Sequence, residues 1–315
     1  MKMKLVFVTF FVCISCFLCA QQMPQHSLFL ESPIVYNPAV TGTAGLLEFT
    51  AAFKKQWTGI NDSPLTAFIS GQALLKNEKT GIGGYVINDI TGPMSYTDIG
   101  FNFSYQIYFG KVGKERVYLN EFNVLESRKL SFGISAGLAQ LRLKGSELEL
   151  TDAVDDAILS ADGSKFYPNA SFGIYYTSPE IYAGLSIPQL LNFDVTLESE
   201  SQFSNVKKLQ HYYFMGGAKF RIKDSRVSLE PNAWLKYVIG APAQATLSLR
   251  TRMKKAGWLG LGYRTQKSLV LDGGIIIKSK VTIGYAFDFY LSDYSKILGQ
   301  THELTLNYKV VKNNR

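Results

Sequence analysis

Cysteine is almost absent from this chain. Its 315 residues include three cysteines, Cys13, Cys16 and Cys19. All three lie within residues 1–20, which have the parts of a secretory signal peptide: an early lysine pair, an apolar core and the small residue Ala20. Cleavage is expected after about Ala20, and the mature chain would then hold no thiol for a disulfide or a thiolate-bound metal. A lipoprotein signal at Cys16 or Cys19 is the weaker interpretation, because Leu18, directly before Cys19, is not small.

Long apolar runs and a high charge content are also missing. Beyond residue 20 no segment approaches the ~18 uninterrupted apolar residues that a membrane helix needs. Charged residues make up 18% of the chain, below the ~25% that is usual for soluble domains. The formal net charge of +8 is spread over predicted turns and loops rather than gathered in one patch. Nucleic acid is therefore not expected as a partner.

Residues that carry chemistry are few and scattered. The three histidines, His26, His211 and His302, do not stand at metal-ligand spacing from one another, and no glycine-rich phosphate loop opens a helix. We therefore expect no catalytic residue, cofactor or metal, and an outer-membrane enzyme is the least favoured alternative. The acidic stretch 152–162 offers oxygen ligands for calcium but lacks the EF-hand alternation, so a solvated loop is favoured there.

Alternating apolar and polar residues are what the chain has in abundance. In residues 99–109, Phe101, Phe103 and Tyr105 fall on one face of an extended strand, and Asn102 and Ser104 fall on the other. This pattern returns along the whole chain without a convincing amphipathic helix between repeats. A strand of roughly 9–11 such residues is long enough to cross a bilayer when it is tilted.

The repeats predict an all-β fold: a transmembrane antiparallel β-barrel of about 14 strands in the outer membrane, spanning residues 46–311. The predicted strands cover residues 46–57, 65–75, 80–88, 96–109, 129–143, 169–177, 181–187, 210–222, 226–239, 244–252, 257–265, 268–277, 280–290 and 302–310. Residues 21–45, with the turn signal Asn37-Pro38, are expected to form an N-terminal periplasmic segment that leads into the first strand. Trp57 and Tyr96 are expected in the aromatic girdles.

The predicted connections alternate between short and long, as a barrel with both ends in the periplasm requires. Segments 144–166, 188–209 and 291–301 are long and fall outside the cell. Segment 110–128 breaks the rule, because it is long where a short turn is needed; it is either a periplasmic loop or contains extra strands. The inward face is mostly small and polar, which is compatible with an open lumen, with a plug, or with closely packed strands.

Several short blocks, in this order and at this spacing, resemble the PorP/SprF family of outer-membrane proteins from the type IX secretion and gliding machinery of Bacteroidota. The blocks are Tyr36-Asn37-Pro38-Ala39 with Gly42; Gln56-Trp57; Gly92-Pro93; Tyr167-Pro168-Asn169 with Gly173; Gly184-Leu185-Ser186-Ile187-Pro188; Gly284-Tyr285-Ala286-Phe287-Asp288; and His302-Glu303-Leu304-Thr305-Leu306. They span residues 36–306, nearly the whole mature chain. Gln189 departs from the histidine that is frequent there in the family.

The resemblance implies a non-enzymatic protein of the cell outer membrane that contacts outer-membrane lipid. It also implies two kinds of protein partner: a secreted type IX cargo such as an adhesin, usually encoded by a neighbouring gene, and periplasmic, peptidoglycan-associated secretion or gliding components. The motif residues would then have structural or partner-binding roles. A porin-like channel is the alternative function, and bilayer conductance would distinguish the two.

Overall fold

The strand β1 (Leu47–Lys55) shows how the alternation builds the wall of the molecule. Phe49 and Phe53 are about half exposed on the outside, whereas Glu48, Thr50 and Lys54 are buried. This is the reverse of a soluble protein, because the apolar face points outward and the polar face inward. Lipid hydrocarbon around the molecule accounts for this inversion. Exposing an apolar side chain to hydrocarbon carries no free-energy penalty, whereas exposing a polar or charged one does.

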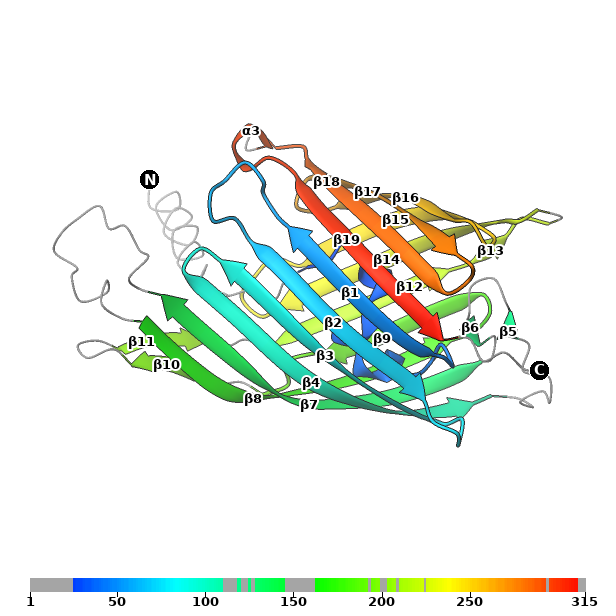
Figure 1. Cartoon of the computed structure of the whole chain (residues 1–315), viewed down its shortest axis with the longest axis horizontal. Helices are drawn as coiled ribbons and strands as arrows, with labels where there is room; N and C mark the ends of the chain where they lie inside the picture. The colour runs from blue at the N-terminus through cyan, green and yellow to red at the C-terminus, as the bar shows by residue number, and fades with distance from the viewer. Residues whose placement is uncertain are drawn as a thin grey trace, which may run out of the picture.

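Fourteen strands close into an antiparallel barrel (Figure 1). They are β1, β2 (Leu65–Leu74), β3 (Thr80–Thr91), β4 (Met94–Tyr108), β7 (Lys129–Lys144), β8 (Asp162–Thr177), β9 (Ile181–Ile187), β12 (His211–Ala218), β14 (Val227–Val238), β15 (Gln244–Met253), β16 (Gly257–Arg264), β17 (Ser268–Ile277), β18 (Val281–Tyr290) and β19 (Thr301–Val310). β1 pairs with β19, and the pairing of β12 with β14 completes the ring. The predicted fold class and strand number are confirmed.

The computed structural model describes residues 25–109, 118–119, 124–125, 128–144, 162–191, 194–198, 203–207, 210–223, 225–292 and 295–310. Within them, no helix is long and apolar enough to cross a membrane. The short elements outside the ring are the hairpins β5 (Tyr118–Leu119) with β6 (Val124–Leu125) and β10 (Asp194–Glu198) with β11 (Phe203–Lys207), the strand β13 (Phe220–Arg221), which pairs with β14, and the helix α3 (Ser295–Leu298).

We call the end where β1 begins and β19 ends the terminal rim, and the opposite end the loop rim. The β5–β6 hairpin lies at the terminal rim and the β10–β11 hairpin at the loop rim (Figure 1). β4 and β7 pair directly from Met94↔Leu143 to Tyr108↔Lys129, so segment 110–128 contributes no strand to the barrel wall. Of this segment, only residues 118–119, 124–125 and 128 are described.

The strand β8 begins seven residues earlier than the predicted start at residue 169. Its first part pairs with β7, through Lys144↔Asp162 and Leu138↔Pro168, and β9 reaches only as far as Phe172 on its other edge. Pro168 lacks a backbone N–H. It is tolerated here because, at this position, the edge of β8 that faces β9 has no barrel strand to hydrogen-bond. The acidic stretch 152–162 is outside the described residues except for Asp162, which is part of β8.

Residues 25–46 lie inside the barrel, where we name them the plug. They form three single 3₁₀ turns, η1 (Phe29–Glu31), η2 (Pro33–Val35) and η3 (Pro38–Val40), and most of their side chains are buried. The sequence predicted residues 21–45 as a periplasmic segment, whereas the structure places the mostly buried residues 26–43 inside the barrel. The predicted interpretation relied on the Asn-Pro turn signal, which is present but is buried against the barrel wall.

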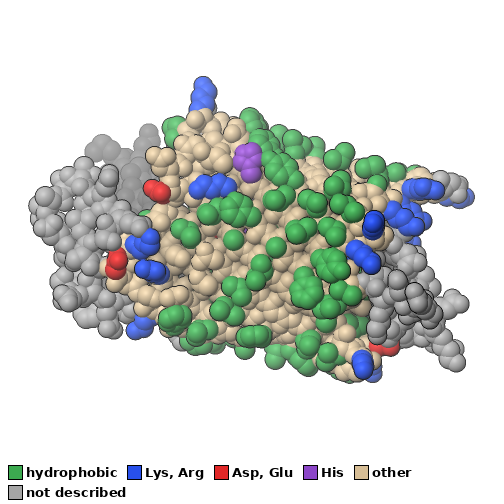
Figure 2. Space-filling view, viewed as in Figure 1, with side chains coloured by type: hydrophobic (Ala, Val, Ile, Leu, Met, Phe, Trp, Pro, Cys, Tyr) green, Lys and Arg blue, Asp and Glu red, His purple; other side chains and the backbone are tan. Residues whose placement is uncertain are grey.

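The outer face of the wall is apolar (Figure 2). Hydrophobic side chains cover the strands in view, and the Lys and Arg side chains in view gather toward the two ends. Large exposed side chains include Phe101 on β4, at 71% of its full exposure, and Leu261 on β16. A belt of this kind between charged ends is the surface that a bilayer covers.

Candidate functional site

The plug crosses the lumen from one rim to the other. Near its start, the backbone carbonyl of Gln25 accepts a hydrogen bond from Lys54, at the loop-rim end of β1. Near its end, the carbonyl of Thr43 accepts one from Lys129, at the terminal-rim start of β7. The candidate site is therefore the plugged lumen together with the openings on either side of it.

Asn37 fixes the middle of the plug to the wall. Its side chain is fully buried; Oδ1 accepts the backbone N–H of Ala39 at 2.9 Å, and Nδ2 donates to the carbonyls of Ile174 and Leu185 at 3.2 and 3.3 Å. These two carbonyls belong to the paired strands β8 and β9. Asn37 thus caps the turn η3 and bonds the wall with the same side chain.

Wall glycines make the room that this contact needs. A Cβ built at Gly173 would lie 2.0 Å from Asn37 Oδ1, and one at Gly184 would lie 2.9 Å from Asn37 Nδ2. On the neighbouring strand β7, a Cβ at Gly133, which pairs with Gly173, would lie 2.2 Å from the backbone nitrogen of Ala39. The small inward residues therefore accommodate a plug, which was one of the possibilities the sequence left open.

The chain beyond η3 turns sharply toward the terminal rim, where β1 begins. Gly42 adopts φ +72°, a left-handed conformation that glycine adopts without a Cβ clash. Just before it, the Thr41 carbonyl accepts a hydrogen bond from Ser104 at 2.6 Å. A Cβ at Gly81 would lie 2.1 Å from the same carbonyl oxygen. The motif Tyr36-Asn37-Pro38-Ala39 with Gly42 is thus a docking sequence for the inner wall.

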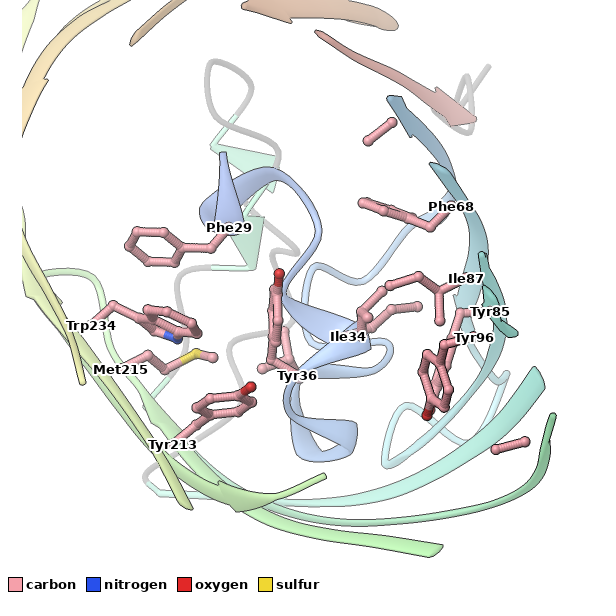
Figure 3. Packing of buried hydrophobic residues seen from close by; sticks show 14 of the residues in the cluster. Phe29, Ile34, Tyr36, Phe68, Tyr85, Ile87, Tyr96, Tyr213, Met215 and Trp234 are labelled. Atoms are coloured by element: carbon pink, nitrogen blue, oxygen red, sulfur yellow. The ribbon is translucent and has the colours of Figure 1, made fainter. Parts of the chain in front are cut away.

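Aromatic side chains form the apolar core of the plugged lumen (Figure 3). Tyr36 points between plug and wall, with its ring centroid 5.5 Å from that of Trp234 and 5.6 Å from that of Tyr213. Phe29 stacks on Trp234 at 5.7 Å. Burial raises the pKa of Tyr36 well above its usual value, so its hydroxyl stays protonated, and it accepts the backbone N–H of His26. Each such aromatic pair contributes about 0.5–1.5 kcal/mol beyond area burial.

Glu303 anchors the start of the plug. This buried side chain on β19 accepts the backbone N–H groups of Ser27 at 2.7 Å and Leu28 at 3.2 Å, and its Oε1 lies 3.2 Å from His26 Nδ1. Beside it, the Ser27 hydroxyl donates to Asp288, which also pairs with Arg264 at 2.9 Å. Hydrogen bonds to a carboxylate are among the stronger ones, so this end of the plug is held by charge.

A second charged anchor holds the turn η1. Arg250, on β15, pairs with Glu31 of the plug at 2.9 Å and with Asp272 of β17 at 2.8 Å. The indole N–H of Trp258 donates to the same Asp272 carboxylate, and the guanidinium lies 5.2 Å from the Trp258 ring centroid. The Glu31 carboxylate of the plug thus joins a network of ion pairs and hydrogen bonds among the wall residues Arg250, Trp258 and Asp272. Sequence reasoning missed these residues, and the available signal was charge at inward strand positions, where a partner is required.

The remaining predicted motif residues lie at several places. Tyr167 and Asn169 are buried on β8 on either side of Pro168, and Asn169 donates to Asp98 at 2.9 Å. The predicted girdle position of Tyr96 is wrong, because this side chain is buried inside and donates to the same carboxylate at 3.2 Å. The carbonyl of Pro188, just after β9, accepts the Ser171 hydroxyl.

The pair His302-Glu303 is divided between the two faces of the barrel wall, and the pair Gln56-Trp57 lies at the loop rim. His302 lies next to Glu303 but on the outer face, where its Nδ1 is 2.6 Å from the Tyr285 hydroxyl. Gln56 and Trp57 follow β1 at the loop rim and line a cavity there. The structure therefore places Tyr36 to Ala39, Gly42 and Glu303 at successive positions along the plugged lumen, and it places His302, Gln56 and Trp57 elsewhere.

Groups of three or more His, Cys, Asp or Glu side chains that could hold a metal ion are not found among the described residues. The buried acids that are described have structural partners instead: Glu303 and Asp288 bind the plug, and Asp98 binds wall side chains. The chemistry of the arrangement is thus that of holding a polypeptide segment inside a ring of strands.

The fold and its plugged lumen define an outer-membrane β-barrel protein. The sequence matches the family of the type IX secretion system membrane protein PorP/SprF over residues 18–308, and the chain belongs to this family. The family and the fold are those of a membrane secretion protein that contacts lipid, and not of a known enzyme family.

Solved structures similar to this chain include other outer-membrane barrels. The Acinetobacter baumannii outer membrane protein Omp33 shares 8% sequence identity at a TM-score of 0.45, over 84% of this chain and 98% of that chain. The CymD monoaromatic hydrocarbon channel shares 10% identity at a TM-score of 0.49, over 90% of this chain and 94% of that chain. No curated protein matches this chain significantly.

Proposed function

We propose that this barrel is a non-enzymatic docking component of type IX secretion that holds an exported cargo protein at its loop rim and a periplasmic partner at its terminal rim. Export by a signal peptide cleaved after about Ala20 is part of this proposal. The observation that carries it is the plugged lumen. A barrel whose interior is occupied by its own buried residues 26–43 is suited to work at its two rims rather than as an open pore.

The two hairpins outside the ring supply surfaces for this work. The β10–β11 hairpin forms a two-stranded sheet of its own, separate from the barrel sheet, and stands at the loop rim. The β5–β6 hairpin does the same at the terminal rim. Because long loops of outer-membrane barrels face outward, we assign the first hairpin to the secreted cargo and the second to the periplasmic machinery.

The test is a pull-down of the tagged protein from mild detergent, with mass spectrometry of what co-elutes. Replacing residues 194–207 by a short Gly-Ser linker should remove a secreted protein and leave periplasmic partners bound. Replacing residues 118–125 should do the opposite, and each deletion is the control for the other. A solitary barrel in every preparation, with steady ion conductance in planar bilayers, would replace this proposal by the porin-like alternative.

A further inference from the structure

Three neighbouring turns at the terminal rim concentrate positive charge. They are residues 222–226, which lead into β14, residues 253–256, between β15 and β16, and residues 277–280, which join β17 to β18. Together they hold six cations and one acid, Asp224, for a net charge of +5. The cations are Lys223, Arg226, Lys254, Lys255, Lys278 and Lys280. We propose that these turns, which we call the basic arc, bind the phosphate headgroups of anionic phospholipids in the adjoining membrane leaflet.

The charge is confined to one end of these strands. At the loop rim, residues 239–243, between β14 and β15, hold no charged side chain, and residues 265–267, between β16 and β17, hold Lys267 alone. Figure 2 shows Lys and Arg side chains gathered at the end of the barrel where Figure 1 labels β13. Cations at one membrane face, and not at the other, are what an attraction to anionic headgroups at that face requires.

Each turn places a cation directly after an exposed apolar residue. The pairs are Ile222-Lys223, Met253-Lys254 and Ile277-Lys278, whose apolar members are 39–46% exposed. Two residues further into the wall, Phe220 and Ile275 lie on the same face and are 60% and 56% exposed. The apolar outer face therefore continues up to the turns, and the cations begin where it ends. Headgroups lie at this boundary, and a lysine stem packs along apolar surface while its ammonium group stays outside.

The acid nearest to the arc in the wall is already neutralised. Glu230 of β14 pairs with Arg252 of β15 at 3.0 Å, and these side chains are 14% and 16% exposed. Lys254 has an interaction of its own and is not required for the site. Within the described residues, the exposed side chains of Lys255, Lys278 and Lys280 enter no ion pair. Their charge is therefore available to a phosphate beside the rim, and such charge-assisted contacts are strong.

The spacing of the turns suits separate headgroups. The turns recur at every second strand of the ring, and because neighbouring strands lie about 4.8 Å apart, successive turns are about 10 Å apart. Each turn is tight: the N–H of Ala256 donates to the Met253 carbonyl at 3.2 Å, and that of Lys280 donates to the Ile277 carbonyl at 3.0 Å. The cations thus stand on ordered backbone, next to apolar residues that a lipid tail can contact. An acidic protein in the periplasm would leave those apolar residues without a role.

The basic arc lies across the ring from the hairpin assigned above to periplasmic partners. The β5–β6 hairpin follows β4 and precedes β7, and six strands on one side and eight on the other separate that junction from the turn between β15 and β16. The inference goes beyond general lipid contact, because it assigns a headgroup charge and a set of side chains. Headgroup binding and protein docking can therefore fail independently of each other.

The experiment reconstitutes the full-length protein in phosphatidylcholine vesicles that contain a trace of spin-labelled phosphatidylglycerol or spin-labelled phosphatidylcholine with the same acyl chains. Electron paramagnetic resonance then gives the relative affinity of each lipid for the protein surface. We expect phosphatidylglycerol to be preferred about threefold. Raising the salt concentration from about 0.1 M to about 1 M shortens the Debye length from about 10 Å to about 3 Å and should remove most of this preference.

Lys278→Gln combined with Lys280→Gln should reduce the preference to less than half. The matched control removes two exposed lysines at the loop rim, Lys267→Gln with Lys296→Gln, and should leave the preference unchanged. Because all four side chains are exposed, both variants should keep the thermal unfolding midpoint. Equal affinity for the two lipids, a preference that survives in the arc variant, or an equal loss in the control variant would overturn the proposal. Saturable binding of a soluble polyglutamate peptide that the arc variant loses, without any lipid preference, would assign the arc to an acidic protein instead.

Discussion

At the scale of the residue, one peptide bond separates a lipid-facing side chain from a lumen-facing one. His302 and Glu303 are neighbours in a strand, so their side chains point to opposite faces. Glu303 is 1% exposed and receives two backbone N–H groups of the plug, whereas His302 contacts Tyr285 outside. The strand period therefore decides which half of the motif engages the plug.

Glu303→Ala should destabilise the protein by about 3 kcal/mol, because it leaves the Ser27 and Leu28 N–H groups and the buried cations near it without their acceptor. The measurement is urea unfolding followed by tryptophan fluorescence, which reports on the buried Trp234 and Trp258. Glu180→Ala, at an exposed turn, is the control and should shift the midpoint little. Equal midpoints for the two variants would show that the anchor carries no net energy.

The fit of Asn37 against Gly173 gives a coupled prediction. Asn37→Ala should cost about 1–3 kcal/mol, since it leaves buried backbone groups without partners. Gly173→Ala should cost a similar amount by displacing the amide. Because both act on one contact, the double variant should cost less than their sum in urea unfolding. Additive costs would mean that the two residues act separately, and Gly71→Ala, on the outer face, is the matched glycine control.

At the scale of the element, apolar and polar side chains alternate along each barrel strand, with the apolar side chains outside and the polar ones inside. Phe101 lies in the middle of β4 and is 71% exposed. Phe101→Lys should cost about 2–4 kcal/mol in vesicles, because a cation then faces hydrocarbon. Ile297→Lys, at 65% exposure in α3 beyond the wall, is the control and should be nearly neutral. Equal costs for the two, measured by urea unfolding from vesicles, would contradict a lipid-facing wall at Phe101.

The same alternation explains which elements the sequence predicts well. Most barrel strands lie within two or three residues of their predicted bounds, because apolar and polar residues alternate along the sequence of each one. The plug has three 3₁₀ turns and no repeating period, so only its Asn-Pro turn was visible. Its role depends on long-range contacts such as Glu31 with Arg250, which are 219 positions apart and which no local pattern reveals.

At the scale of the whole molecule, the direction of the plug places the two ends of the described chain at opposite rims. Gln25 lies at the loop rim and Val310 at the terminal rim. An epitope tag inserted before Gln25 should therefore bind antibody on intact cells, and a tag after Val310 should bind only after permeabilisation. Antibody binding to both tags, or to neither, on intact cells would contradict this orientation.

The seated plug also determines whether the barrel conducts. The intact protein should show little ion conductance in planar bilayers, because aromatic stacking and two charged anchors hold the plug across the lumen. Deleting residues 25–45 should open a stable conductance through the lumen, past the polar inner wall.

Because this deletion removes the partners of Trp234 and Tyr213, folding can suffer, and Gly133→Ala is the milder variant. Its Cβ would lie 2.2 Å from the Ala39 nitrogen and displace the plug. Gly262→Ala, whose Cβ would meet wall atoms only, is its control. A conductance that stays closed after the plug is deleted would mean that the wall itself seals the lumen, and the plug would then serve stability alone.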